Sequence, residues 1–444
     1  MLNPDSTLVI VMILFGAGSS VPFDIPGMEG FTKQFLDRYK DKYSFIINIG
    51  EAIEESEGII GFPLSFDLET LLAVLNDLSG EKKKPISVPT TSLLLKEKLK
   101  LHEAREKYGK DGSSALIDLE EFIFNSCMQP IKNGKKEGNF KLFDLFYGPL
   151  LTLLNGVGLE NIQAHIRNIY STNWDICFKT WLDYRNIPID DGTGIDKQSY
   201  PILDLSKFDP TGLDQSPSGI RYVPLHGSLD LVQVSRPKGL GAYKDIQKVP
   251  DPIGYFENKP SNLKNVFTIY PLEAIGYEES VKSPYLDLLN HFKAVLRRED
   301  RVFIIGYSLR DPTIGSIFEE VIAERMRNGH INLMSKDLDS RKSEAVSGKH
   351  SFRIIVVNPS PDKLVDNLQK QSQLNLLQTF IPIKIRFPRA TDPDFRAGYA
   401  NALGRLFKDL QKIGYLTSGS GGIVLDELQS KYGITRDQIA ADYA

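Results

Sequence analysis

The sequence is poor in cysteine, with only Cys127 and Cys177 among 444 residues. Two cysteines so far apart exclude a disulfide framework and a four-cysteine zinc site, and their scarcity is typical of a reducing compartment. We therefore expect a cytoplasmic protein. The chain also lacks an excess of one charge, because its formal net charge is -4. Such a balance gives no bulk attraction to nucleic acid, so no direct nucleic-acid binding is expected.

Long apolar runs are missing as well. The run Leu8–Phe15 spans eight residues, whereas a membrane-spanning helix needs about 20. Asp5 precedes this run and no lysine or arginine occurs before Lys33, which argues against the basic start of a signal peptide. With 41% hydrophobic and 25% charged residues, the composition is ordinary for a soluble globular protein with a sizeable core, and no membrane contact is expected.

The apolar run leads directly into Gly16-Ala17-Gly18-Ser19-Ser20. A stretch rich in Val and Ile and stopped by glycine predicts a strand buried on both faces. The glycines allow a sharp turn and a close approach to a bulky group, and the first-turn amides of a helix expected from about Phe31 attract phosphate. This combination indicates a nucleotide site. Because no glycine lies three residues after Gly18, the spacing is not the dinucleotide fingerprint, and a tight turn that merely needs small residues is an equal alternative.

Residues 51–158 carry helical patterns and are expected to form a large all-helical insertion after the first βα unit. Within it, leucines from Leu68 to Leu78 share one face of an amphipathic helix that Ser65 would cap. Further helices are expected over 93–108, 114–127 and 140–155, with a basic loop at 132–136. The charges of the first of these helices indicate a solvated face.

An α/β pattern follows the insertion. Strands are expected at 167–170, 221–225, 301–305, 352–357 and 382–387, helices ending at Asp183 and Met326 and spanning 285–297 and 395–413, and irregular connections at 186–217 and 237–264. The pattern predicts an α/β fold with a Rossmann-like parallel sheet flanked by helices, formed by residues 1–415. Residues 417–422, Thr-Ser-Gly-Ser-Gly-Gly, predict a flexible linker. Residues 416–444 are thus expected to be a linker and a small helical tail suited to subunit contacts.

Polar or glycine-bearing motifs follow five of the expected strands, and the carboxyl edge of an open parallel sheet is where ligands bind. His226 precedes Gly227 at such a strand end; it can act as an acid or base near neutrality, or it only caps the next turn. Asn173 has a donor and an acceptor that can position a water or a ribose hydroxyl. Asp175 either lies in the same crevice or caps the next helix.

Two later strand ends add further candidates. Gly306 and Ser308 form a turn that suits a phosphate or a ribose, and Asp311-Pro312 is typical of a helix start with proline at its first position. Asn358 either accepts a ribose hydroxyl or starts an Asn-Pro turn.

Taken in order, these segments resemble the sirtuin (SIR2) family. The resemblance runs from about Leu8 to Ile413 and rests on Gly16-Ala17-Gly18-Ser19-Ser20 with Ile25-Pro26, Ser171-Thr172-Asn173-Trp174-Asp175, Leu225-His226-Gly227-Ser228, Gly306-Tyr307-Ser308-Leu309 and Asn358. It implies NAD+ as substrate and Asn173 and His226 as catalytic residues. It also implies NAD contacts from Ala17, Gly18, Ser19, Asp24, Asn173, Asp175, Gly306, Ser308 and Asn358. In the implied mechanism, amides of the glycine turn bind the pyrophosphate, Asn173 places water or ribose hydroxyls, and His226 accepts a proton.

Departures from the family pattern narrow the function. Typical sirtuins hold a structural zinc with two cysteine pairs, whereas here no cysteine follows Cys177, so no metal is expected. Pro26-Gly27-Met28-Glu29 replaces the family's Pro-Asp-Phe-Arg, and Asp24 stands where glycine is usual. The peptide cleft of deacylases lies beside the zinc module, so these departures argue against protein deacylation.

The large insertion and the motifs 171–175 and 306–312 look more like the bacterial and archaeal antiphage-defence branch. That branch hydrolyses NAD+ to nicotinamide and ADP-ribose, which depletes NAD in the infected cell. The expected function is therefore an NAD+ glycohydrolase of antiphage defence. An NAD-dependent protein deacylase and a catalytically idle subunit that senses NAD or ADP-ribose are the alternatives. The resemblance also implies a homo-oligomer and a separate ATPase/helicase or Argonaute-like partner.

Overall fold

The computed structural model describes most of the chain: residues 11–54, 68–79, 101–138, 140–156, 166–195, 201–204, 207–208, 219–234, 245–258, 263, 266–268, 284–299, 301–309, 311–328, 352–362, 364, 380–416 and 418–440. Strand residues 8–10, the proposed cap Ser65 and residues 93–100 lie outside these ranges. Among the described residues, no helix is both long and apolar enough to cross a lipid bilayer.

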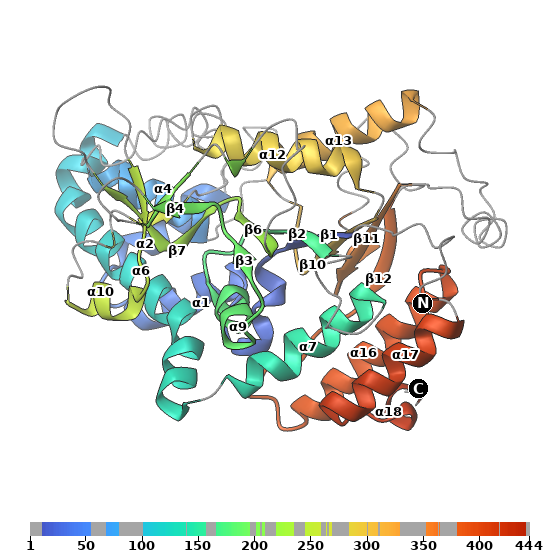
Figure 1. Cartoon of the computed structure of the whole chain (residues 1–444). Coiled ribbons are helices and arrows are strands. Elements are labelled where there is room, and N and C mark those ends of the chain that lie inside the picture. The colour runs from blue at the N-terminus through green and yellow to red at the C-terminus, as the bar shows by residue number, and fades with distance from the viewer. Residues whose placement is uncertain are drawn as a thin grey trace.

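Seven parallel strands form the central sheet (Figure 1). They are β1 (Val11–Phe15), β2 (Ile166–Ser171), β3 (Ile189–Asp190), β6 (Ile220–Pro224), β10 (Arg301–Ile305), β11 (Arg353–Asn358) and β12 (Phe380–Lys384). Their order is β12-β11-β10-β1-β2-β6-β3. The chain builds β2 and β6 on one side of β1 and then crosses to β10 on the other. The predicted Rossmann-like sheet is confirmed, and the order reverses between the paired strands β1 and β10. Such sheets bind ligands outside the carboxyl ends of the strands at this point.

Helices cover both faces of this sheet. In Figure 1, α12 (Tyr285–Arg298) and α13 (Pro312–Arg327) lie above it, and α7 (Lys141–Asn155), α9 (Cys177–Tyr184) and α16 (Phe395–Lys412) lie below. Strand β1 alternates between the two layers: Val11, Ile13 and Phe15 join the core on one side, and Met12 and Leu14 join the core on the other. Every side chain of β1 is at most 1% exposed. The prediction of a strand buried on both faces is therefore confirmed.

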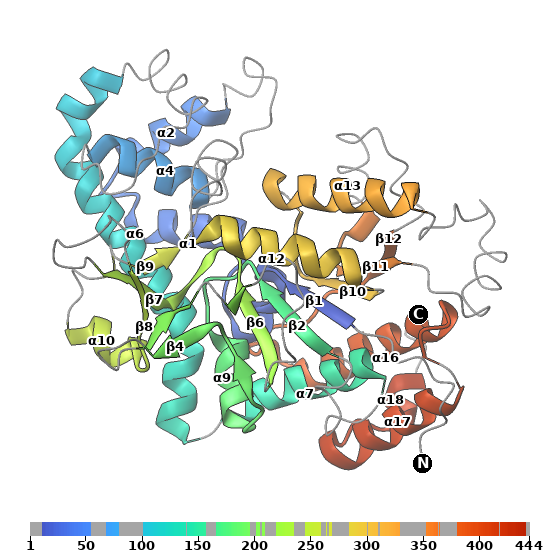
Figure 2. The same cartoon turned by 45° about the horizontal axis from the view of Figure 1, so that its top comes forward.

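The insertion is helical throughout its described part. It contains α4 (Leu68–Ser79) and α6 (Leu101–Glu137), which gather with α1 (Met28–Tyr39) and α2 (Phe45–Glu54) to one side of the parallel sheet (Figure 2). The five leucines of α4 from Leu68 to Leu78 are at most 1% exposed, so the predicted apolar face is confirmed.

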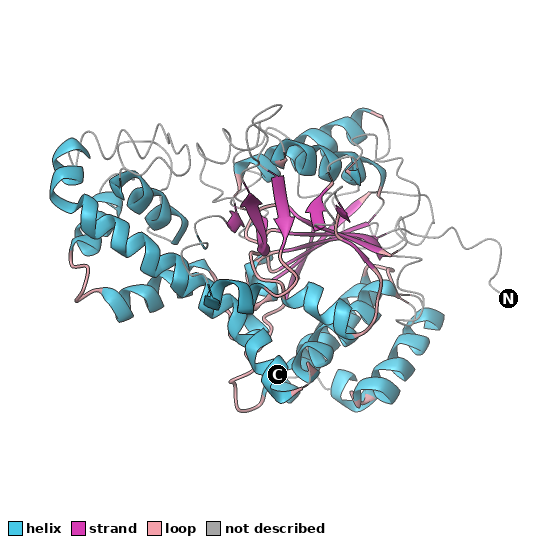
Figure 3. Cartoon of the chain, turned by 60° about the vertical axis from the view of Figure 1, so that its left-hand side comes forward, coloured by secondary structure: helices cyan, strands magenta, loops and turns pink. Residues whose placement is uncertain are grey.

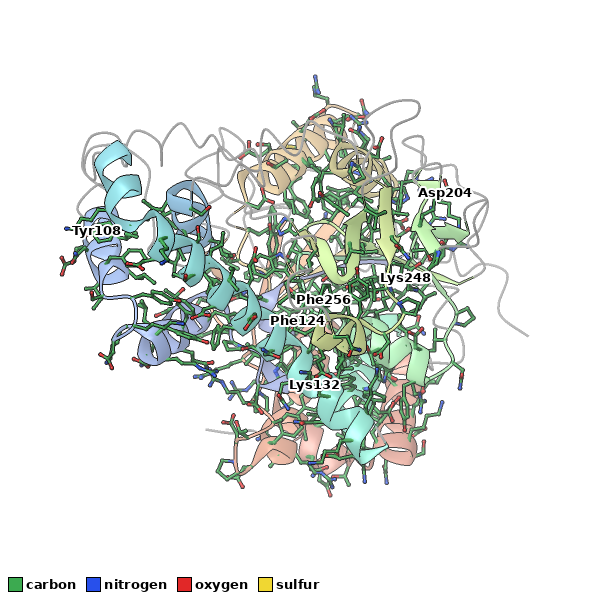
Figure 4. The ribbon with its side chains drawn as sticks, turned by 90° about the vertical axis from the view of Figure 1, so that its left-hand side faces the viewer. Tyr108, Phe124, Lys132, Asp204, Lys248 and Phe256 are labelled. Carbon is green, nitrogen blue, oxygen red and sulfur yellow. The ribbon has the colours of Figure 1, made fainter. Side chains whose placement is uncertain are left out.

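The loop predicted at 132–136 is wrong, because α6 is one continuous helix of 37 residues, roughly 55 Å long at 1.5 Å per residue. Its Gly109 and Gly112 lie against α4, where a Cβ on Gly112 would come within 3.0 Å of Leu78 Cβ. Close packing at these glycines offsets their low helix propensity. Near its C-terminal end α6 is bound to α10 (Pro252–Asn258). There the rings of Phe124 and Phe256 lie 5.0 Å apart, and Lys132 Nζ lies 2.9 Å from Glu257 Oε1 (Figure 4).

A second, antiparallel sheet consists of β4 (Thr193–Ile195), β5 (Pro201–Leu203), β7 (Gly227–Val234), β8 (Asp245–Lys248) and β9 (Val266–Thr268), in the order β4-β5-β8-β7-β9. It takes three of its strands, β4, β5 and β8, from segments that were predicted to be irregular. Strands of three or four residues carry too little periodicity to be detected. The longer β7 pairs with β8 and β9, β8 pairs with β5, and β5 pairs with β4. Figure 3 shows the strands of both sheets in magenta, with helices on either side.

The predicted flexible linker is also wrong, because Ser418–Tyr432 forms α17 and Arg436–Ala440 forms α18. A Cβ on Gly421 would lie 3.4 Å from the ring of Phe407, and a Cβ on Gly404 would lie 2.8 Å from the carbonyl oxygen of Ile439. Val424 and Leu428 are fully buried. Packing against α16 and α7 therefore orders a glycine-rich start whose local propensity favours coil.

The packing of the C-terminal helices predicts opposite effects for two glycine-to-alanine variants. Gly422→Ala fills open space in the first turns of α17 and should raise the free energy of unfolding by about 0.5–1 kcal/mol. Gly404→Ala would displace α18 and should lower it by about 1–3 kcal/mol. Urea unfolding measures both. A free tail would leave both values unchanged, and that result would contradict the observed packing.

Candidate active site

A cavity of about 380 Å³ opens at the carboxyl edge of the parallel sheet, next to the ends of β1 and β10. Its volume lies within the range of roughly 300–1,000 Å³ of small-molecule sites. Loops after β1, β2, β6, β10 and β12 line it, and α1 and α6 complete its wall. The lining residues are Ala17, Gly18, Ser20, Ile25, Pro26, Gly27, Glu29, Gly30, Phe31, Cys127, Thr172, Asn173, Trp174, Asp175, His226, Gly306, Tyr307, Ser308, Asp311 and Arg389.

The floor of the cavity is formed where the turns after β1 and β10 touch. Gly16 N donates to Ile305 O at 2.9 Å, and Gly18 N donates to Gly306 O at 2.8 Å. Gly306 has a φ of +64°, and a Cβ there would lie 2.4 Å from Ser19 N. Only glycine meets both demands without strain. The tight-turn interpretation of the glycines is thus correct, and the same turns also line the cavity.

The amides of this glycine turn are used within the protein. Those of Gly16, Gly18, Ser19 and Ser20 all donate to carbonyl oxygens of the chain. These four amides are therefore engaged in holding the turn, and the binding of a pyrophosphate by the turn stays a prediction.

Asn173 is held by serines from the glycine turn. Its Nδ2 donates to Ser19 Oγ at 3.1 Å and to Ser20 Oγ at 2.9 Å. The side chain is only 9% exposed, and its Oδ1 has no hydrogen-bond partner within the described part of the chain. A buried acceptor without a partner costs about 1–3 kcal/mol. Oδ1 therefore offers a fixed acceptor to a hydroxyl or water in the cavity.

Asp175 performs both of its predicted roles. Its Oδ1 accepts from Cys177 N at 3.0 Å, which caps α9, and the residue also lines the cavity. Ser20 Oγ donates to Oδ2 at 2.6 Å. Burial raises the pKa of the Asp175 carboxyl above the usual 3.8, and the hydrogen bond from Ser20 opposes this rise.

His226 is paired with Asp311. His226 Nε2 lies 2.8 Å from Asp311 Oδ2, and both side chains are buried. Asp311 Oδ1 accepts from Thr313 N and Ile314 N, so the residue also caps α13, as its sequence predicts. An ionised Asp311 accepts the proton on Nε2, which leaves Nδ1 as the basic nitrogen. The pair therefore has the arrangement of a general base with an orienting carboxylate.

Three predicted NAD-binding residues do not line the cavity. Ser19 Oγ accepts a hydrogen bond from Asn173 Nδ2. Asp24 has a φ of 60° and accepts from Thr391 Oγ1 at 2.7 Å. Asn358 starts the turn after β11 by accepting from Ser360 N. Their positions support the cavity from outside, and direct ligand contact by these three residues is not supported.

Sequence reasoning missed the pairing of His226 with Asp311 and the arrival of Arg389 at the cavity. The pair is separated by 85 residues, and Arg389 follows β12 near the far end of the chain. No local pattern connects such positions, because only the folded sheet brings them together. Asn173 and His226, both predicted, do line the same cavity.

Comparison with protein families finds a match for the part of the chain that carries the two predicted catalytic residues. Residues 167–355 match the family model of the SIR2-like domain. The matched segment, which is less than half of the chain, is therefore similar to the SIR2-like domain. The match includes Asn173, His226 and Asp311 but neither the glycine turn nor Arg389. No curated protein matches the chain.

This similarity supports the prediction of an NAD-dependent activity. Within the described ranges, no group of three or more His, Cys, Asp or Glu side chains is placed to hold a metal ion.

The buried Asp175 predicts a pH effect on stability. A carboxyl whose pKa is raised by folding contributes fully to the stability of the folded state below pH 3.8. This contribution to the free energy of unfolding is lost as the pH rises through the raised pKa. Asp175→Asn abolishes that loss. The free energy of unfolding of the variant, relative to that of the wild type, should therefore increase between about pH 4 and pH 7. Denaturant unfolding across this range tests it, and a difference independent of pH would contradict it.

Proposed function

We propose that this chain is an NAD+ glycohydrolase, which cleaves the bond between nicotinamide and ribose to give nicotinamide and ADP-ribose. The observation that carries the proposal is the shared cavity of Asn173 and the His226–Asp311 pair. On the resemblance to the antiphage-defence branch, we extend the proposal to an effector that depletes NAD during infection.

The reaction requires two contributions from the protein, which are stabilisation of the developing charge and a positioned water. Nicotinamide is cationic in NAD+, so the bond electrons move onto its ring nitrogen as it leaves. The ribose becomes an oxocarbenium-like centre that water attacks at C1′. In the proposal, Asn173 Oδ1 accepts a hydrogen bond from this water or from a ribose hydroxyl. His226 Nδ1 takes the proton that the water loses, and Asp311 stabilises the resulting imidazolium.

The deciding experiment measures NAD+ consumption by the purified full-length protein, with and without the products of neighbouring genes. Products are identified by chromatography and mass spectrometry. Release of nicotinamide and ADP-ribose in the absence of any acylated peptide supports the proposal. Release only with an acylated peptide would establish a deacylase, and ADP-ribose binding without turnover under all conditions would establish a sensing subunit.

Removal of either central side chain should abolish turnover. His226→Ala deletes the base and Asn173→Ala deletes the acceptor, so we expect kcat to fall at least about 100-fold. Nicotinamide release measures it, and circular dichroism verifies folding. Asn328→Ala, at the exposed end of α13 and away from the cavity, is the matched control. Near wild-type turnover in either active-site variant would refute the assignment.

Asp311→Asn separates the two roles of this carboxylate. The amide oxygen still caps α13, but the amide NH2 donates toward His226 Nε2 and forces the ring proton onto Nδ1. We therefore expect kcat to fall about 100-fold or more with little change in unfolding free energy. Asp394→Asn is the control, because Asp394 precedes α16 without a capping hydrogen bond and lies outside the cavity lining. Unchanged kcat in Asp311→Asn would remove Asp311 from the mechanism.

A further inference from the structure

The charged side chains around the cavity differ in whether they bind partners within the protein. Asp175 and Asp311 each bind protein donors. Arg389 is exposed at the cavity wall, and within the described ranges its guanidinium has neither an ion pair nor a hydrogen bond. It is also the one lysine or arginine among the described lining residues. Among the lining residues that the structure describes, Arg389 is therefore the one free, permanently charged cation, and its five donors are unused.

A dinucleotide brings two negative charges to this cavity on its pyrophosphate. Four amides of the glycine turn are already donating to the protein, and carboxylates line the same space. Burial of an anion beside carboxylates is unfavourable unless a cation compensates it. The guanidinium is suited to this task, since its planar donors match phosphate oxygens in pairs.

The segment that carries Arg389 is fixed to the loop after β1. Ala390 N donates to Pro22 O at 3.0 Å, and Thr391 Oγ1 donates to Asp24 Oδ1 at 2.7 Å. Arg389 N donates to Asp392 Oδ2 at 2.8 Å, which closes the turn. These bonds hold the backbone of Arg389 beside the 3-10 turn Val21–Phe23, so the side chain is delivered to the cavity by an ordered loop.

We propose that Arg389 binds the pyrophosphate of the ligand, and that Asp24 and Thr391 are positioning residues for it. The inference rests on the proposed function only for the identity of the ligand. It assigns to Asp24 a role other than direct NAD contact, and it gives the loop after β12 a binding role that lies outside the matched SIR2-like segment.

The test compares two probes by calorimetry on the full-length protein: ADP-ribose, which has the pyrophosphate, and adenosine, which lacks it. Arg389→Gln should weaken ADP-ribose binding at least tenfold, which corresponds to about 1.4 kcal/mol, and change adenosine binding less than twofold. Arg389→Lys should restore part of the loss. The matched control is Arg386→Gln, since Arg386 is exposed in the same loop but does not line the cavity.

A second pair of variants tests the positioning role. Thr391→Val removes the hydroxyl that binds Asp24 and should weaken ADP-ribose binding several-fold, whereas Thr391→Ser keeps the hydroxyl and should bind as the wild type does. Equal affinity of Arg389→Gln and wild type for ADP-ribose would overturn the proposal. So would equal losses for Arg389→Gln and Arg386→Gln, or no ADP-ribose binding by the wild type. Because binding is measured without turnover, an Arg389-dependent affinity in a protein that fails to hydrolyse NAD+ would refute only the glycohydrolase.

Discussion

The contact between the turns after β1 and β10 is the constraint on which the site depends. Two backbone hydrogen bonds join these turns, and glycine at 18 and 306 is required because a Cβ on either would overlap the other turn's backbone. The contact lies at the ends of β1 and β10, where the strand order reverses. It fixes the serines that hold Asn173 and brings the segment of Asp311 within reach of His226.

Six of the seven strands of the central sheet were predictable because their signals are local, whereas the two-residue β3 lies in a segment predicted to be irregular. The strand 301–305 matches β10 residue for residue, since a continuous apolar run is bounded there by charged residues and by glycine. Asn173 and His226 were predictable for a related reason: each lies two residues after the end of a parallel strand, and parallel strands present these positions at one edge of the sheet.

Other features depend on contacts between distant segments, which no local pattern records. Gly109 and Gly112 suggest a break in the helix, yet at these two positions α4 packs closely against α6. The glycine-rich start of α17 suggests a linker, yet it lies against α16. Asp311 is recognisable from the sequence as a helix cap but not as the partner of a histidine 85 residues away. Arg389 follows the last strand of the sheet, so its place at the cavity depends on the pairing of that strand.

The long helix α6 has a mechanical consequence. Its Cys127 forms part of the cavity wall, its C-terminal end is fixed to α10 by the Phe124–Phe256 pair and by Lys132, and its other half extends to Tyr108 among the outer helices (Figure 4). A stiff rod that is anchored near one end pivots about the anchor. Cys127 lies between the two anchoring contacts at Phe124 and Lys132, so a tilt of the outer helices moves the half that carries Tyr108 most and Cys127 least. The volume available to a ligand is therefore insulated from forces on a surface far from the sheet edge.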